Sequence, residues 1–256
     1  MRVTDRFEGN PVRVGDRIGR GRLGEVFAVS AGARGLALKV YRGFRANPHD
    51  VADAMRRAAR SGLLFPDARA GRLRLAPAIG AVTVEDAGDT VPGLLMPRAR
   101  GRPLGEWVET GPDRAVRLEV LGRLLVGLAA LHEKALAHND LSFGNVLVGA
   151  DVWLIDFDRA GDAPPPLARA GLFYDRVATG PAEDVRAFVC LAAMVLSGRH
   201  PFIADPARFV READVGAAPF SRTPEPPSDA DLTEFYRLAL AGAVGARDLL
   251  PLWPGH

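Results

Sequence analysis

Apolar and polar residues alternate along the first part of the chain in three short runs that are separated by glycines. The runs cover residues 12–14, 25–29 and 36–41. A period of two is the pattern of a strand with one face buried, because successive side chains of a strand point to opposite faces. The pattern therefore predicts a three-stranded meander, and strand-like segments at 78–84 and 91–96 extend it to a small sheet.

A helical period replaces this alternation later in the chain. Residues 51–64 already form one candidate helix within the β-rich part. Beyond a connector at residues 98–103 the candidate helices follow one another at 104–109, 112–134, 184–197 and 229–243. In the longest of these, leucine or alanine recurs at positions 118, 121, 125, 128, 129 and 131, which is the spacing of one helix face. A β-rich first part joined to a helical second part is the predicted architecture.

The composition is that of a globular protein, with 48% hydrophobic and 25% charged residues among 256. The longest apolar run, residues 187–196, is too short to cross a bilayer as a helix. The N-terminus lacks the apolar segment of a secretory signal. A single cysteine, Cys190, excludes an internal disulfide. We therefore expect a cytoplasmic protein with no membrane insertion.

Charge is distributed unevenly along the chain although the net charge is only +2. Residues 1–100 hold 18 Lys and Arg against 10 Asp and Glu, a balance of +8, and the remainder holds 15 against 21, a balance of −6. A basic first part suits an anionic ligand. It has no basic stripe interleaved with aromatic residues, so we expect no nucleic-acid partner.

Glycine and lysine mark one candidate phosphate site. Residues 18–26 form a G-x-G-x-x-G-x-V loop that lies between two predicted strands, which favours a phosphate-covering flap over a dinucleotide-binding turn. Fifteen residues after Gly24 comes Lys39, one of two lysines in a chain with 31 arginines. Lysine is a compact point charge and arginine a planar fork, so retention of lysine at this position indicates a specific requirement.

Asparagine and aspartate mark a second candidate site. Two of the four asparagines lie in the stretch His138-Asn139-Asp140-Leu141-Ser142-Phe143-Gly144-Asn145. Asp156 follows an apolar segment at 152–155 and begins the triplet Asp156-Phe157-Asp158. Each acid or amide alone is compatible with an ordinary turn. The order and spacing of all of them together indicate phosphate and metal chemistry.

Together these motifs resemble the eukaryotic-like protein kinase family over residues 12–243, in a form close to a divergent bacterial branch with D-F-D in place of D-F-G. The resemblance implies an α+β, protein-kinase-like two-lobed fold. A small β-rich N-lobe with one αC-type helix would precede a larger, mostly helical C-lobe. It further implies a single domain over 1–256, with the N-lobe at about 1–97, the hinge at 97–102 and the C-lobe at about 103–256.

The resemblance also assigns roles to individual residues. Asp140 would be the catalytic aspartate, Lys39 would contact the α- and β-phosphates, and Asn145 and Asp156 would bind Mg²⁺ or Mn²⁺. In the hinge, the carbonyl of Pro97 and the N–H of Ala99 would bind adenine, so the missing N–H of proline costs nothing there. The implied ATP-binding residues are Ile18, Gly19, Gly21, Gly24, Val26, Ala37, Lys39, Met96, Pro97, Ala99 and Leu147.

Several positions depart from the family pattern. Residues 51–64 contain no glutamate to pair with Lys39, so Asp53 is the nearest acidic candidate and Asp50 the second. Asn139 stands where many kinases have an arginine that receives an activation-loop phosphate, so activation by that route is not expected. Ser142 replaces the lysine that usually follows the catalytic aspartate. Only 28 residues separate Asp156 from Asp184, so the peptide-docking platform is shortened.

The expected function is that of an ATP- and Mg²⁺-dependent phosphotransferase, with a serine/threonine-protein kinase favoured. Its partners would be a protein substrate or a regulatory protein. Two alternatives stay open. The missing glutamate motivates a nucleotide-binding pseudokinase that acts as a regulatory module, and Ser142 with the short platform motivates a small-molecule kinase.

Overall fold

The computed structural model describes the chain except for residues 22, 43–47, 162–179, 202–231, 241–244 and 255–256. The chain forms two compact units. The first contains Met1–Arg69, Arg74–Ala99 and Ile155–Asp158, and the second contains Ala70–Leu73, Arg100–Leu154 and Arg159–His256. Within the described ranges, none of the helices has the length and apolar character needed to cross a membrane.

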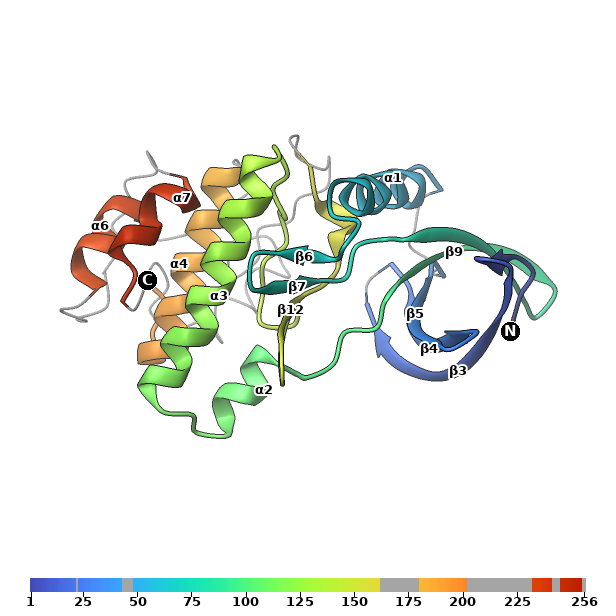
Figure 1. The fold of residues 1–256 in the computed structure, drawn as a ribbon, viewed down its shortest axis with the longest axis horizontal. Helices are drawn as coiled ribbons and strands as arrows, with labels where there is room; N and C mark the ends of the chain where they lie inside the picture. The colour runs from blue at the N-terminus through green and yellow to red at the C-terminus, as the bar shows by residue number, and fades with distance from the viewer. Residues whose placement is uncertain (22, 43–47, 162–179, 202–231, 241–244, 255–256) are drawn as a thin grey trace, which may run out of the picture. The chain divides into compact units, whose positions relative to one another are not determined.

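An antiparallel sheet of seven strands forms the body of the first unit (Figure 1), in the order β1-β8-β9-β5-β4-β3-β2. The predicted meander and its extension are confirmed, and the structure adds two short edge strands, β1 and β2. The strands are β1 (Arg2–Val3), β2 (Arg6–Phe7), β3 (Asn10–Arg20), β4 (Glu25–Ala31), β5 (Arg34–Val40), β8 (Gly80–Asp86) and β9 (Asp89–Pro97).

The central strand of this sheet, β5, is buried on both faces. Leu36, Leu38 and Val40 point into a hydrophobic core with residues of the neighbouring strands, among them Val29 and Leu95. The alternate residues of β5 are also shielded from solvent, because they line the opposite face. A polar side chain on that second face is therefore held in a largely dry environment, where its charge needs partners.

The helix α1 (Pro48–Leu64) belongs to the first unit and ends at Leu64, the predicted last residue. Its buried face consists of Val51, Ala54, Ala58 and Ser61. Gly62 lies so close to the backbone that an added Cβ would stand 1.8 Å from the carbonyl oxygen of Ala78. Small residues along this face thus let the helix approach the chain closely.

Helices dominate the second unit. Figure 1 shows α3 and α4 packed side by side. The carboxylate of Asp113 caps α3 by accepting a hydrogen bond from the Val116 N–H at 2.9 Å. The described helices are α2 (Leu104–Glu109), α3 (Arg114–Glu133), α4 (Pro181–Ser197), α6 (Thr233–Leu240) and α7 (Ala246–Leu249), followed by the 3₁₀ turn Leu250–Leu252.

Short strands accompany these helices. An antiparallel ladder joins β10 (Arg102–Pro103), β11 (Val146–Val148) and β12 (Val152–Leu154). Two further strands, β6 (Arg69–Ala70) and β7 (Leu73–Leu75), lie where the chain passes between the units. The predicted helices at 104–109, 112–134 and 184–197 are confirmed within three residues. Only part of the helix predicted at 229–243 is described, as α6.

Aromatic rings close the core of the second unit near the end of the chain. Phe188 of α4, Phe235 of α6 and Trp253 pack edge to face, with ring centroids 5.1–6.0 Å apart. The indole N–H of Trp253 donates to the carbonyl of Leu118 at 3.1 Å and so ties the C-terminal segment to α3. Cys190 is fully buried in α4, as expected of a small core residue.

Candidate functional site

The glycine-rich loop joins β3 to β4, so it lies between two strands as predicted. The Gly21 N–H donates to the Gly24 carbonyl at 2.8 Å and closes a tight turn. A Cβ on Gly24 would lie 2.1 Å from the carbonyl oxygen of Val40, so the fold itself requires glycine there. A Cβ on Gly21 would meet only the Gly24 oxygen, at 3.9 Å. Among the described residues, none would clash with a Cβ at position 21. Arg22 lies outside the described residues.

The register of the sheet places four of the predicted ATP-binding residues on one face. Lys39 lies opposite Val26 of β4, and Ala37 lies opposite Met96 of β9. Directly opposed residues of an antiparallel pair share a face, as do residues two apart on one strand. Val26, Ala37, Lys39 and Met96 therefore lie on one face of the sheet, the face that is turned away from the aliphatic core.

The remaining predicted nucleotide contacts are distributed along the chain. Ile18 on β3 is 45% exposed. Gly19 pairs with Val26, Pro97 ends β9, and Ala99 follows it. Leu147 lies on β11 in the second unit, half-buried between its partners Pro103 and Trp153.

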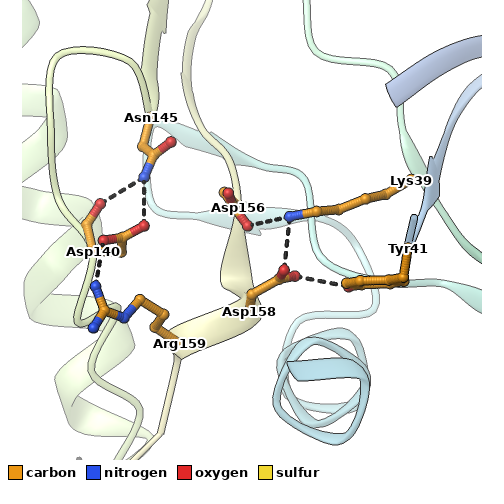
Figure 2. A network of polar contacts seen from close by, with 7 residues as sticks. All are labelled: Lys39, Tyr41, Asp140, Asn145, Asp156, Asp158 and Arg159. Atoms are coloured by element: carbon orange, nitrogen blue, oxygen red, sulfur yellow. Dashed lines mark hydrogen bonds and ion pairs between the residues drawn. The ribbon is translucent and has the colours of Figure 1, made fainter. Parts of the chain in front are cut away.

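Lys39 lies at the centre of a polar cluster in the first unit (Figure 2). Its side chain is 7% exposed, and its Nζ lies 2.7 Å from Oδ1 of Asp156 and 2.7 Å from Oδ2 of Asp158. The hydroxyl of Tyr41 donates to the other oxygen of Asp158 at 2.9 Å. Tyr41 stands two residues after Lys39, so both side chains project from the same face. One lysine is thus shared by two carboxylates.

The predicted pairing of Lys39 with Asp53 is corrected by this geometry. The Asp53 carboxylate accepts from Arg56 at 2.8 Å and from Arg57 at 3.0 Å, both on its own helix. Residues three and four positions apart are neighbours on a helix, so these arginines capture the acid locally. The hydrogen bond from Arg57 is the largest influence on the Asp53 carboxyl, and it lowers the pKa below the ordinary value.

Burial and charge oppose each other at Lys39. Burial disfavours the ammonium form, but the nearby carboxylates of Asp156 and Asp158 outweigh it and raise the pKa of Lys39 above its ordinary value. Burial, and then repulsion by Asp156, raise the pKa of Asp158, and Lys39 offsets part of that rise. Burial and the adjacent Asp158 likewise raise the pKa of the Tyr41 hydroxyl. Lys39 is therefore a protonated cation and Tyr41 a neutral donor at neutral pH.

Asp140 is held by two side chains in the second unit (Figure 2). The amide nitrogen of Asn145 donates to the Asp140 carbonyl at 2.7 Å and to its Oδ2 at 3.1 Å. The guanidinium of Arg159 donates to Oδ1 at 3.1 Å. Both carboxylate oxygens thus have a fixed donor, and the carboxylate is still about one-third exposed. Exposure together with a fixed orientation suits an acid that meets a ligand.

Asp184 holds the loop that carries Asp140 in place. Its buried carboxylate accepts from the backbone N–H of His138 at 2.6 Å and of Asn139 at 2.8 Å, and it lies 3.2 Å from His132 Nε2. Burial alone would raise the pKa of Asp184, but the hydrogen bonds from His132 and the loop hold it below its ordinary value.

We expect the Asp184→Asn variant to unfold about 2–3 kcal/mol more easily than the wild type at pH 7, because a buried ionic acceptor of two N–H groups is lost. A carboxyl with a lowered pKa in the folded state stabilises the protein above its unfolded pKa, about 4, and loses this effect as the pH falls through the folded value. The difference between variant and wild type should therefore shrink below about pH 4. Urea unfolding at several pH values measures this, and a pH-independent difference would contradict it.

Asn139 connects the same loop to two other segments. Its side chain is buried, and its backbone has φ of 60°, in the left-handed region that asparagine tolerates better than most residues. The amide nitrogen donates to the carbonyls of Arg159 and Gly161, each at 3.1 Å, and the amide oxygen accepts from the Gly180 N–H at 2.8 Å. Position 139 therefore offers no cation for a phosphate. Its side chain is used instead in hydrogen bonds between uncharged groups.

Three residues with prominent contacts were not predicted as site residues: Tyr41, Asp158 and Arg159. Two departures in the sequence pointed toward Asp158 and Arg159. A glutamate is missing from the helix at 51–64 while an extra acid appears at position 158. A cation is missing at position 142 while one appears at position 159. When a charged residue is missing at one position of a motif and an additional one of the same sign appears at another, the second can take the place of the first in the folded chain.

Comparison with known proteins gives a consistent result. No family model matches the chain. It is 29% identical over 151 residues, 53% of its length, to the serine/threonine-protein kinase drp72 of Corynebacterium efficiens. It is 30% identical over 218 residues, 77% of its length, to the protein of Thermomonospora curvata named "Probable serine/threonine-protein kinase PkwA". It is 31% identical over 214 residues, 72% of its length, to the serine/threonine-protein kinase pkn2 of Myxococcus xanthus.

These matches cover only part of each relative, namely 29% of drp72, 28% of PkwA and 24% of pkn2. The chain is therefore similar to a segment of bacterial proteins that are named as serine/threonine-protein kinases. A kinase-like fold follows from this similarity, and the mixed α and β content described above agrees with it.

Proposed function

We propose that this chain is a protein kinase of the eukaryotic-like family, in a divergent branch with D-F-D in place of D-F-G. It would transfer the γ-phosphoryl group of ATP to a serine or threonine hydroxyl of a protein. The observation that carries the proposal is the 2.7 Å contact of Lys39 with Asp156, two residues 117 positions apart to which the family resemblance assigns phosphate and metal binding. The similarity to bacterial serine/threonine-protein kinases supports it.

The proposal includes an arrangement of the whole chain and a place for the nucleotide. Residues 1–97 would form the N-lobe, 97–102 the hinge and 103–256 the C-lobe of a single domain. Val26, Ala37, Met96 and Leu147 would contact adenine, as the family resemblance implies. The carbonyl of Pro97 and the N–H of Ala99 would bind its edge. The exposed side chain of Ile18 would be covered when the nucleotide binds.

Asp156 and Asn145 would hold Mg²⁺ or Mn²⁺. Both amide protons of Asn145 are donated to Asp140, so its amide oxygen is the atom suited to a cation. Mg²⁺ commonly takes one or two protein ligands and completes its shell with phosphate oxygens and water. The ion would neutralise phosphate charge.

The protein side chains would act mainly by positioning. Asp140 would orient the attacking hydroxyl and accept its proton, with its carboxylate held by Asn145 and Arg159. Lys39 would donate to the α- and β-phosphates, and the glycine-rich loop would cover them. Positioning and charge neutralisation account for most of the catalysis in phosphoryl transfer.

Arg159 offers a test of this positioning. We expect Arg159→Ala to lower kcat about tenfold with little change in the KM for ATP, because Asp140 loses the donor to Oδ1 while the nucleotide contacts remain. Steady-state kinetics measures both constants. Arg247→Ala is the matched control, since Arg247 forms an exposed ion pair with Glu133 at 2.8 Å. Equal losses in the two variants would contradict the role of Arg159.

Incubation with radiolabelled ATP and Mg²⁺ or Mn²⁺ tests the proposed function. Label on generic protein substrates or on the chain itself is the expected result. Nucleotide binding without any transfer would reject the kinase and favour the regulatory pseudokinase. ATP consumption with alcohol metabolites but no protein labelling would favour a small-molecule kinase, the alternative that Ser142 motivates. Absence of nucleotide binding would reject all three.

A further inference from the structure

We propose that Asp158 is the permanent counter-ion of Lys39 and positions its ammonium group for the phosphates of the nucleotide. Asp158 would thereby replace the helix glutamate that the chain lacks. The inference deepens the proposed function and rests on it where the nucleotide is concerned. The contact between the two side chains stands by itself.

Contacts fix both side chains of this pair. Oδ2 of Asp158 lies 2.7 Å from Nζ of Lys39, and Oδ1 accepts from the hydroxyl of Tyr41 at 2.9 Å. The Asp158 side chain is 8% exposed and the Lys39 side chain 7%. A buried carboxylate held from two sides has one orientation, so it also fixes the ammonium group that it contacts.

Asp156 contacts Lys39 equally closely, but it is the proposed metal ligand. A carboxylate that binds a divalent ion and faces phosphates gives up much of its attraction for the lysine. Asp158 would then be the carboxylate that still neutralises Lys39. Two acids around one lysine thus have separate uses, one for the metal and one for the amine.

Helix α1 supplies no competing acid on its buried face. The side chains there are Val51, Ala54, Ala58 and Ser61, none of which carries a charge. The Asp53 carboxylate is bound by Arg56 and Arg57. A lysine in this buried position requires a counter-ion, because an uncompensated buried charge is costly. The short segment that carries Asp156 therefore provides it.

The placement has a mechanical consequence within the first unit. Asp156 and Asp158 are separated only by Phe157, a buried residue in the 3₁₀ turn Phe157–Arg159. The metal ligand and the lysine partner are thus fixed by the same turn. Any movement of this turn would change both together, and the position of α1 would not decide whether Lys39 is paired.

Nucleotide binding tests the role of the Asp158 charge. Asp158→Asn keeps the size of the side chain and an acceptor for Tyr41 but removes the charge, and Asp158→Glu restores the charge on a longer stem. We expect Asp158→Asn to weaken MgATP binding about tenfold by calorimetry and to raise the KM for ATP similarly. Asp158→Glu should recover part of the affinity. Asp53→Asn, the matched control in the same unit, should bind as the wild type does.

Amine acylation tests the pairing without any nucleotide. The chain has only two lysines, and Lys134, at the exposed end of α3, serves as an internal reference. We expect Lys39 to react slowly in the wild type and about tenfold faster in Asp158→Asn, because its ammonium group loses one of the two carboxylates that hold it. The rate at Lys134 should stay unchanged. Quantitative mass spectrometry of the two peptides measures both rates.

The outcomes separate this inference from the proposed function. If Asp53→Asn weakens binding and exposes Lys39 while Asp158→Asn behaves as the wild type, the inference is overturned. If Asp158→Glu is as impaired as Asp158→Asn, packing rather than charge explains the loss, which also overturns it. If the wild type binds no MgATP, the proposed function fails, and the acylation rates still decide whether Asp158 pairs with Lys39. Should Asp158→Asn not fold, the acylation rate of Lys39 in Tyr41→Phe decides the question, because this variant releases one side of Asp158. An increase smaller than that expected for Asp158→Asn would support the inference. An unchanged rate would overturn it.

Discussion

Replacing Asp140 with asparagine is expected to lower the rate of phosphoryl transfer by about 10²–10⁴-fold, the range typical for loss of a general base. The variant keeps an oxygen acceptor for Asn145 or Arg159, so the loop should stay folded. It loses the carboxylate that accepts the proton of the hydroxyl. Single-turnover transfer of labelled phosphate measures the effect, and calorimetry should show MgATP binding close to that of the wild type.

The control for this variant is Asp113→Asn. Asp113 caps α3 in the same unit through the Val116 N–H, and it takes no part in the proposed chemistry. We expect at most about 1 kcal/mol of lost stability from its replacement and no change in rate. Turnover by Asp140→Asn at the wild-type rate would reject Asp140 as the catalytic acid–base residue.

Asp156→Asn is expected to lower the rate about 100-fold or more and to remove the dependence of ATP affinity on Mg²⁺. Several kcal/mol of charge stabilisation at the phosphates depend on the metal, and each 1.36 kcal/mol corresponds to a tenfold change in rate. The fold should survive, because Lys39 keeps its contact with Asp158 at 2.7 Å. Calorimetric titration with ATP, with and without Mg²⁺, measures the change.

A second acid of the first unit gives the comparison. Asp86 forms ion pairs with the N-terminal amine and with Arg42, away from the predicted metal ligands in sequence. We expect Asp86→Asn to retain the full increase in affinity on addition of Mg²⁺. An Asp156→Asn protein whose affinity still rises with Mg²⁺ as in the wild type would contradict the assignment of Asp156 as a metal ligand.

The strands and helices could be predicted from the sequence because their side-chain periods are local. The alternation around Lys39 identified β5, and the helical spacing of leucines identified α3 almost to its ends. The two edge strands β1 and β2 were missed, because strands of two residues are too short to show a period. The glycine loop was recognised by its spacing, and Gly24 fits the backbone beside Val40 for a reason that only the structure shows.

The partner of Lys39 could not be predicted, because it depends on which way each acid points in space. Asp53 was the nearest acid on the expected helix, yet arginines three and four positions away bind it. Asp158 was visible in the sequence only as a departure from a motif. Its contact with Lys39 depends on the fold, which brings β5 and the turn after β12 together. Arg159 is a similar case, because it supplies near Asp140 a cation that position 142 lacks.

Asn139 has a consequence for how such an enzyme would be controlled. In kinases with an arginine at the position of Asn139, that arginine gains its partner only when the activation loop is phosphorylated. Here an uncharged amide joins the loop to Gly161 and Gly180 through bonds that exist as soon as the chain has folded. Treatment with a phosphatase would then leave these bonds of the loop intact.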